Sequence, residues 1–348
     1  MAMSTTSSTK ETLGVRTANS LSKRWKGGFQ LTQERIVVAI VVIMFVTFAI
    51  TLNGFLNLTN LLALVQSVSI LGILGIGMAI TIIGRGIDLA IISTMAMSVA
   101  WVLSMLNNGM PVGSAVLLGY LFVVCIGFTI GFMVAYAEIP AIFATLAMTT
   151  TIYGFTRVAL VDIDLVFLPE SAAWTRSFGG GYVFGIPVPV LAFSGIALVA
   201  HLFLRYTKPG VFIRSMGDNP AKARNTGIPT RPMIVLQYVL SASIAFFAGL
   251  ILATLVSTMN TRIVNSSMIY DVILVVVLGG VVLSGGKGGV FNVIVGTLLI
   301  GIFLNGMTIL NISYSVQNLI KGFVLLVAIV VDTFINPRDE QTSQQGDI

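Results

Sequence analysis

Long apolar runs, broken at intervals by short polar stretches, dominate the pattern of the chain. No charged residue occurs between Arg35 and Arg85, and none occurs between Asp88 and Glu138. A lipid-spanning helix needs about 20 apolar residues, and an ionised side chain at the bilayer centre costs at least about 2.5 kcal/mol. Each uncharged gap is too long for a single span, so the pattern predicts several membrane-spanning helices.

Turn-forming residues divide both gaps, with NGFLNLTN (Asn53–Asn60) in the first and NNGMPVG (Asn107–Gly113) in the second. Together with the charges, these breaks predict an all-α, polytopic integral membrane protein with about ten transmembrane helices. The candidate spans lie near residues 36–52, 61–83, 88–107, 113–136, 139–160, 186–204, 232–256, 270–284, 289–308 and 317–335.

One membrane domain is expected between two polar tails. Residues 1–35 are rich in Ser, Thr and basic residues and are predicted to be an N-terminal tail, because this composition cannot bury a core. Residues 36–335 are the predicted transmembrane domain, and residues 336–348 are a C-terminal tail. The first apolar run is longer than a signal-peptide core and no cleavage pattern follows it, so it is expected to stay as the first helix.

The predicted loop 205–231 carries a cluster of basic residues. With the N-terminal tail in the cytoplasm this loop is cytoplasmic too, in agreement with the positive-inside rule, and so is the C-terminus. The loop 161–185 then lies outside, and its charges are of both signs. The basic residues of the inner loop are Arg205, Lys208, Arg214, Lys222, Arg224 and Arg231, opposed only by Asp218.

Composition narrows the class further. The chain is 56% hydrophobic and only 9% charged, against about 25% charged in soluble proteins. Its net charge of +6 is concentrated in the tail and in loops beside apolar spans, so nucleic-acid binding is not expected. The single Cys125 lies in an apolar run and is predicted to be a small buried residue, and His201 is expected near a membrane interface.

No catalytic centre, cofactor site or metal site is expected. The carboxylates fall mostly in tails and loops, and no cluster of His, Cys and Asp has the spacing of metal ligands. GGVVLSGGKGG (Gly279–Gly289) resembles a phosphate-binding loop, but the spacing is wrong and Gly288 follows Lys287 where that motif needs Ser or Thr. It is predicted to be a tight glycine turn on the cytoplasmic side.

Small residues are frequent within the spans, as in GILGIG (Gly72–Gly77) and GFTIG (Gly127–Gly131). Such residues let helix backbones approach closely in lipid. Packing within the chain explains them better than dimerisation, although the pattern allows both.

The most polar internal stretch is MGDNPAKARNTG (Met216–Gly227). Asp218 or Asn219 can cap a helix that begins at Pro220 and ends before Gly227. A short helix is therefore predicted in an aqueous loop. It is either a connector whose backbone groups are hydrogen-bonded within the helix, or a rigid projection that transmits a movement from a soluble partner to the membrane helices.

From about residue 60 to 335 the chain resembles the membrane permease subunits of bacterial ABC importers for simple sugars, of the ribose, galactose and xylose type. The 205–228 stretch is the most specific part of the resemblance, because its small and polar residues match over more than twenty positions. Four stretches carry the resemblance: GRGIDLAIISTMAM (84–97), IPVPV (186–190), RYTKPGVFIRSMGDNPAKARNTGI (205–228) and LGGVVLSGGKGGVFNVIVGTLLIGIFLNG (278–306).

The resemblance implies a homodimeric or pseudo-dimeric permease in the bacterial inner membrane. It also implies an ABC ATPase subunit below, which holds the ATP and Mg, and a periplasmic solute-binding protein above. In that family the matching loop forms a coupling helix seated on the ATPase. The ATPase-coupling residues carried over are Gly217, Asp218, Asn219, Ala221, Lys222, Ala223, Arg224 and Gly227, with Lys222 and Arg224 on the exposed side.

Other roles follow from the resemblance with less support from the residues. Gly86, Asp88 and Asn305 are candidates for the solute pathway, although Arg85 replaces a glycine that the family usually has. Arg85 and Asp88 are also spaced for a simple helical ion pair. Candidates for docking the binding protein are Asp162, Asp164, Glu170 and Arg176.

Two other functions stay open at this point. An ion-coupled secondary transporter would use a carboxylate within the membrane, such as Asp88, Asp271 or Asp332. A membrane scaffold without transport is also compatible with glycine-rich spans. The resemblance implies instead a transport subunit, not an enzyme, that takes up a simple sugar or sugar-like polyol.

Overall fold

The computed structural model describes residues 33–335, a mostly helical chain; the two predicted tails lie almost entirely outside this range. The longer helices are α2 (Gln33–Thr51), α3 (Leu58–Ile83), α4 (Ile91–Asn107), α5 (Val112–Ala135), α6 (Ala141–Ala159), α8 (Val188–Tyr206), α11 (Thr230–Val256), α12 (Met268–Leu278), α13 (Val290–Ile309) and α14 (Tyr314–Ile335). The shorter elements are β1 (Leu165–Phe167), the 3-10 helix η1 (Glu170–Arg176), α7 (Ser177–Gly180), β2 (Tyr182–Val183), β3 (Ile186–Pro187), α9 (Lys208–Asp218), α10 (Pro220–Asn225), β4 (Thr258–Asn260) and the 3-10 helix η2 (Thr261–Asn265).

Each predicted span overlaps one of the longer helices, but the count of about ten membrane spans is not confirmed. Within residues 33–335, six helices are both long and apolar enough to cross a bilayer: α3, α5, α8, α11, α13 and α14. Of the others, α4 and α12 are apolar but shorter. The fold is therefore that of a polytopic membrane protein, with fewer spans assured by length and composition than the sequence pattern predicts.

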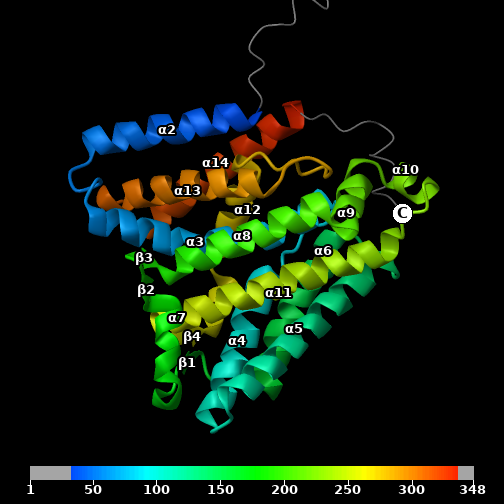
Figure 1. Cartoon of the computed structure of the whole chain (residues 1–348), viewed down its shortest axis with the longest axis horizontal. Coiled ribbons are helices and arrows are strands. Elements are labelled where there is room, and N and C mark those ends of the chain that lie inside the picture. The colour runs from blue at the N-terminus through cyan, green and yellow to red at the C-terminus, as the bar shows by residue number, and fades with distance from the viewer. Residues whose placement is uncertain (1–32, 336–348) are drawn as a thin grey trace, which may run out of the picture.

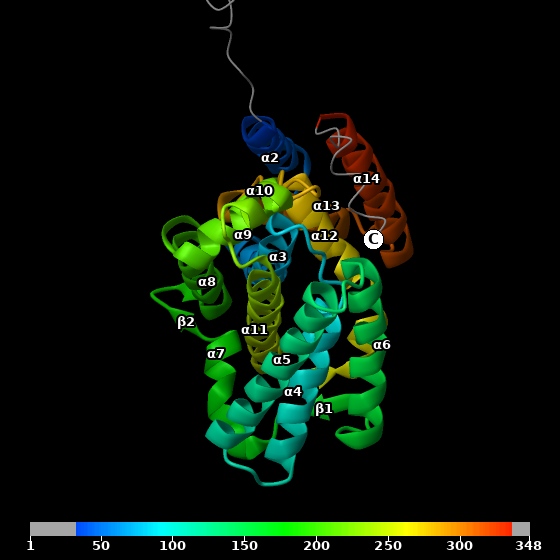
Figure 2. The ribbon, with the colours of Figure 1, turned by 90° about the vertical axis from the view of Figure 1, so that its right-hand side faces the viewer.

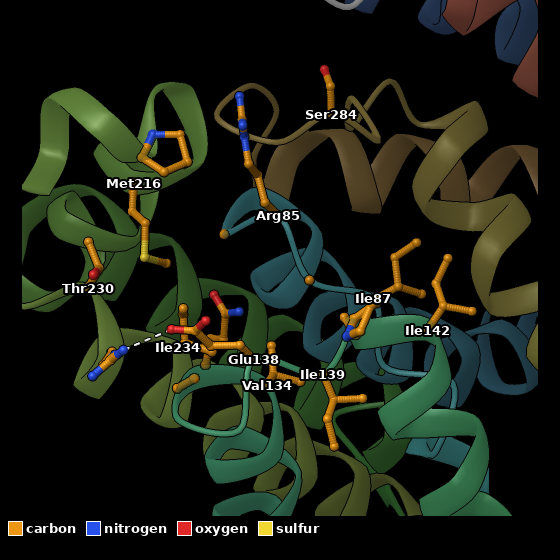
Figure 3. Close-up of a pocket in the computed structure, with 18 of the residues that line it drawn as sticks. Arg85, Ile87, Val134, Glu138, Ile139, Ile142, Met216, Thr230, Ile234 and Ser284 are labelled. Carbon is orange, nitrogen blue, oxygen red and sulfur yellow. Dashed lines mark hydrogen bonds and ion pairs between the residues drawn. The ribbon is translucent and has the colours of Figure 1, made fainter. Parts of the chain in front are cut away.

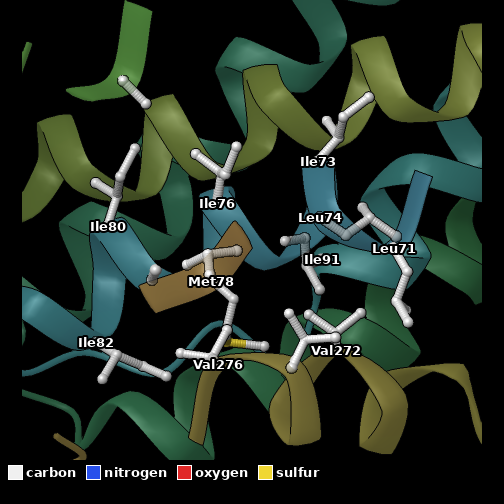
Figure 4. Close-up of a cluster of buried hydrophobic side chains, with 14 of the residues drawn as sticks. Leu71, Ile73, Leu74, Ile76, Met78, Ile80, Ile82, Ile91, Val272 and Val276 are labelled. Carbon is white, nitrogen blue, oxygen red and sulfur yellow. The ribbon is translucent and has the colours of Figure 1, made fainter. Parts of the chain in front are cut away.

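Helix α3 lies at the centre of the bundle. It packs against α8, α11, α12 and α13, and most of its residues from Val68 to Ile83 are buried. Figure 4 shows the Met78 side chain of α3 directed toward Val276 of α12, whereas Ile76 points to the opposite side of α3. Because the centre of this protein and the lipid around it are both apolar, the core is defined by close packing and not by a polar outer face.

The glycines of the spans serve packing within the chain, as predicted. A Cβ at Gly72 would lie 2.6 Å from the Phe193 ring of α8. A Cβ at Gly131 of α5 would lie 2.6 Å from the backbone of Val235 in α11. These positions therefore set the close approach of α3 to α8 and of α5 to α11.

The short elements gather at two opposite ends of the bundle (Figures 1 and 2). One end, here called the α10 end, holds α9, α10, the connection 84–90 and the glycine turn 279–289. The other, here called the β end, holds two antiparallel ladders, β1 with β4 and β2 with β3. These short ladders depart from the predicted all-α class.

Cys125 is exposed, so the prediction that it is buried is wrong. It lies on a face of α5 that is left uncovered within residues 33–335. An apolar run in a membrane protein does not tell which side of a helix faces the core, because lipid accepts apolar side chains as readily as the core does.

Candidate functional site

The polar stretch 216–227 folds as its caps predict. The Asn219 Oδ1 accepts a hydrogen bond from the Lys222 N–H at 2.9 Å, and Pro220 occupies the first turn of α10. Gly227, just beyond the helix, has a φ of +80°, which glycine adopts without strain. The prediction of a short capped helix is confirmed.

The sequence reasoning missed the helix before it, α9. Thr207 caps α9 by accepting from the Gly210 N–H at 3.2 Å, and a proline lies in its first turn. The letters TKPG carry this start signal, so the whole segment 208–225 could have been read as two short helices.

The side chains of α10 divide between solvent and protein. Ala221, Lys222 and Arg224 are exposed, as are the flanking Asp218 and Gly227. Ala223 is only 3% exposed and packs inward, so it supports α10 and does not form its outer surface. The exposed part of α10 is therefore small, basic and rigid.

The end of α3 and the glycine turn both contact α9, just before α10 begins. Arg85 follows the end of α3, with its Nε donating to the Gly217 carbonyl at 2.8 Å and its Nη2 to the Asp218 carbonyl at 3.3 Å. Gly286, from the glycine turn, donates its N–H to the Ile83 carbonyl at 2.9 Å. We call this meeting point of α3, α9 and the glycine turn the junction.

The junction is packed at backbone distance. A Cβ at Gly217 would lie 1.8 Å from the Ile83 carbonyl oxygen, so no side chain fits there. Burial lowers the pKa of the Arg85 guanidinium and the nearby Asp218 carboxylate opposes that shift. The α9–α10 segment and the end of α3 are therefore in direct backbone contact.

Arg85 and Asp88 do not form the helical ion pair that their spacing allows. Arg85 has a φ of +66° and lies outside any helix, so the i, i+3 geometry does not apply. Asp88 is buried and turns the other way: its carboxylate accepts from the Ser241 hydroxyl of α11 at 2.7 Å and from the Ala90 N–H at 3.1 Å. The segment 84–90 thus links the junction to α11 and to the start of α4.

A cavity of about 640 Å³ opens at the α10 end. Figure 3 shows Arg85 and Ser284 on one side of it and Glu138 with Ile139 on the other. Glu138 pairs with Arg231 at 2.8 Å. Of the predicted pathway residues, Gly86 lines this cavity.

Gln237 also lines this cavity and was missed from the sequence. It is 1% exposed, and its Oε1 is buried without a hydrogen-bond partner. A lone amide in the apolar run 232–256 is the signal that could have found it, because unsatisfied polar groups within a membrane protein are costly.

A second cavity, of about 410 Å³, lies toward the β end between α3, α12 and α13. Its polar lining is Ser67, Asp271, Asn305 and Thr308. The pathway candidates are therefore not brought together: Gly86 lines the first cavity, Asn305 the second, and Asp88 neither.

The loop 161–185 lies at the β end and is held by ion pairs. Asp164 accepts from Arg157 at 3.2 Å and from Arg262 at 2.6 Å, and Glu170 pairs with Arg176 at 2.9 Å. These charges fix the loop, whereas Asp162 points to solvent.

The known proteins that this chain resembles are permeases, which agrees with its architecture as a polytopic membrane protein. The family model "Branched-chain amino acid transport system / permease component" matches residues 60–329. A ribose import permease protein of Haemophilus influenzae is 30% identical over 88% of this chain and 95% of its own length. The ribose import permease protein of Escherichia coli K12 is 31% identical over 87% and 94%.

An L-arabinose ABC transporter permease protein of Azospirillum brasilense is 29% identical over 89% of this chain and 91% of its own. No solved structure matches the chain. The family match runs from the first turn of α3 into α14. The chain therefore belongs to this permease-component family, together with the ribose and arabinose permeases of ABC transporters.

Proposed function

We propose that this chain is the membrane permease of an ATP-driven importer in the bacterial inner membrane, and that it takes up a simple sugar or sugar-like polyol. A separate ABC ATPase, which binds the ATP and Mg, grips α10 from the cytoplasm. A solute-binding protein docks at the β end, where Asp162 is exposed. A second permease copy completes the channel.

The observation that carries this proposal is the continuous series of direct contacts between the α9–α10 segment and the membrane helices. A force on α10 reaches Arg85 through the Gly217 and Asp218 carbonyls. From Arg85 it reaches Asp88 along three peptide bonds, and from Asp88 it reaches α11 through Ser241. An outside protein that moves α10 therefore moves the walls of the first cavity.

The charges support the assignment of sides. The α10 end carries Lys208, Arg214, Lys222 and Arg224, and such a basic excess favours the cytoplasmic face. Of these residues, Lys222 and Arg224 give α10 a surface complementary to an acidic cleft on a partner. Names of the relatives point to pentoses as the solutes to try first.

The test is uptake of radiolabelled D-ribose and L-arabinose into liposomes that hold the complete complex of permease, cognate ATPase and binding protein. We expect uptake only with ATP inside and the ATPase present. The double variant K222E/R224E should lose ATPase copurification and uptake by at least about tenfold, since exposed charges set both encounter and register. K208E, which reverses one exposed charge on α9, is the control and should keep both.

Uptake driven by a proton or sodium gradient without the ATPase would contradict the proposal and favour a secondary transporter. Retention of the ATPase by K222E/R224E, with unchanged uptake, would contradict the role of α10.

A further inference from the structure

A buried ion pair joins α12 and α14. It takes no part in the contacts that run from α10 through Arg85 and Asp88 to α11. The Lys321 Nζ lies 2.7 Å from the Asp271 Oδ1 and 3.0 Å from its Oδ2. The two side chains are only 5% and 15% exposed. Charged groups within a membrane domain are costly, so such a pair marks a functional position more often than a structural one.

The two members of the pair differ in what they face. Asp271 lines the second cavity, whereas Lys321 is not among its lining residues. The cavity is therefore lined by the Asp271 carboxylate, whose charge is balanced by Lys321 on the side away from the cavity. A group entering it finds a strong hydrogen-bond acceptor without a net negative field.

The other polar groups of the cavity complete a set suited to hydroxyls. Ser67 and Thr308 line the cavity, and their hydroxyls donate to the Leu64 and Leu304 carbonyls, so the oxygen of each remains able to accept a hydrogen bond. Asn305 uses one of its two amide N–H groups on Asn60, at 2.9 Å, which leaves the other to donate.

The remaining wall is aliphatic, with Leu64, Val68 and Leu71 from α3. A polyol presents both hydroxyls and C–H faces, and sites for small molecules combine an apolar lining with a few placed polar groups. The volume of about 410 Å³ lies within the range of about 300–1,000 Å³ typical of such sites.

The position of the cavity also fits an entry site. It is built from the first half of α3, the first turn of α12 and the second half of α13, all toward the β end. Buried α3 residues such as Ile73, Ile76 and Ile80 lie between it and the α10 end. The two cavities are therefore separated by packed apolar side chains.

We propose that the second cavity binds the transported solute on its way in, and that the Asp271–Lys321 pair selects neutral polyols over anionic ones. Asp271 accepts hydrogen bonds from two solute hydroxyls. The balanced charge of the pair leaves no cation to compensate a carboxylate or phosphate on the solute, so sugar acids and sugar phosphates are rejected. This inference rests on the proposed function and names the site where it acts.

The test is a charge swap, D271K/K321D, in the complete complex in liposomes. The swap keeps the ion pair but removes the carboxylate from the cavity. Uptake of D-ribose, L-arabinose and D-ribonate and the hydrolysis of ATP are measured together at saturating loaded binding protein. We expect uptake of the neutral sugar to fall at least about tenfold, as for one lost charge-assisted hydrogen bond, while ATP hydrolysis is retained.

A milder variant guards against misfolding of the swap. T308V removes one acceptor from the cavity and should lower uptake per ATP by about fivefold, the value of an ordinary hydrogen bond. T333V is its matched control, because Thr333 makes the same bond to its own helix, with Ile329, on an exposed face of α14. T333V should transport like the wild type.

Each other outcome overturns part of the idea. Wild-type uptake by the charge swap, or equal uptake by T308V and T333V, overturns the site while the importer function stands. Uptake of D-ribonate by the wild type overturns the selection of neutral solutes. Failure of the wild type to take up either sugar with ATP overturns the proposed function and this inference with it.

Discussion

At the scale of single residues, the junction depends on two glycines, which have no side chain, and on the long side chain of one arginine. Gly217 and Gly286 let three backbones come within hydrogen-bonding distance, and Arg85 fills the space beside them. The residue type at each of these positions gives no sign of its role in the sequence alone. What makes it special is a neighbour more than 100 residues away along the chain.

The substitution G217A should loosen the junction. Its Cβ would overlap the Ile83 carbonyl, a backbone atom that cannot turn aside, so we expect a loss of about 1–3 kcal/mol of stability. Thermal unfolding in detergent and ATP-driven uptake check this, and both should decline. G195A is the control, because nothing lies within 4 Å of a Cβ there and alanine favours the helix.

At the scale of elements, the short segment 84–90 joins three helices. Asp88 holds the start of α4 through Ala90 and reaches α11 through Ser241. A negative group near a helix N-terminus also favours the helix dipole. The segment therefore positions α4 and α11 together, and a movement at its Arg85 end shifts both.

The substitution D88A should remove both hydrogen bonds and lower stability by about 1.5–3 kcal/mol for each charged one. D88N should stay close to the wild type, because its Oδ1 still accepts from Ala90 and the Ser241 hydroxyl can accept from its Nδ2. Thermal unfolding and uptake are the measurements. Complete loss of uptake in a well-folded D88N would instead indicate that the charge of Asp88 is used in ion coupling.

At the scale of the whole molecule, the two ends of the bundle differ in charge and in structure. The α10 end is basic and carries the junction, whereas the β end carries the ladders and the ion-paired loop (Figure 1). Solute that enters at one end and leaves at the other crosses the packed residues around α3. If the proposed solute path runs through this chain, α3 and its neighbours must move apart during transport.

The orientation can be tested with introduced cysteines after replacing the exposed Cys125 by serine. Phe184 at the β end is fully exposed, and Lys222 lies on the exposed side of α10. In intact cells, a membrane-impermeant maleimide should label F184C at once and K222C only after the membrane is opened. Labelling of K222C from outside would reverse the topology and contradict coupling to a cytoplasmic ATPase.

The sequence by itself determined the membrane class, the approximate place of every long helix, the C-terminal glycine of α10 and two candidates for its N-cap, Asp218 and Asn219. These are local properties, since apolar run length, Asn219 and Gly227 act within a few residues. It did not determine which face of α5 meets lipid or where Arg85 and Asp88 point, because lipid and core are equally apolar and both side chains bond to distant segments. Only the tertiary structure brought Arg85 to Gly217, Asp88 to Ser241 and Lys321 to Asp271, over separations of 132, 153 and 50 residues.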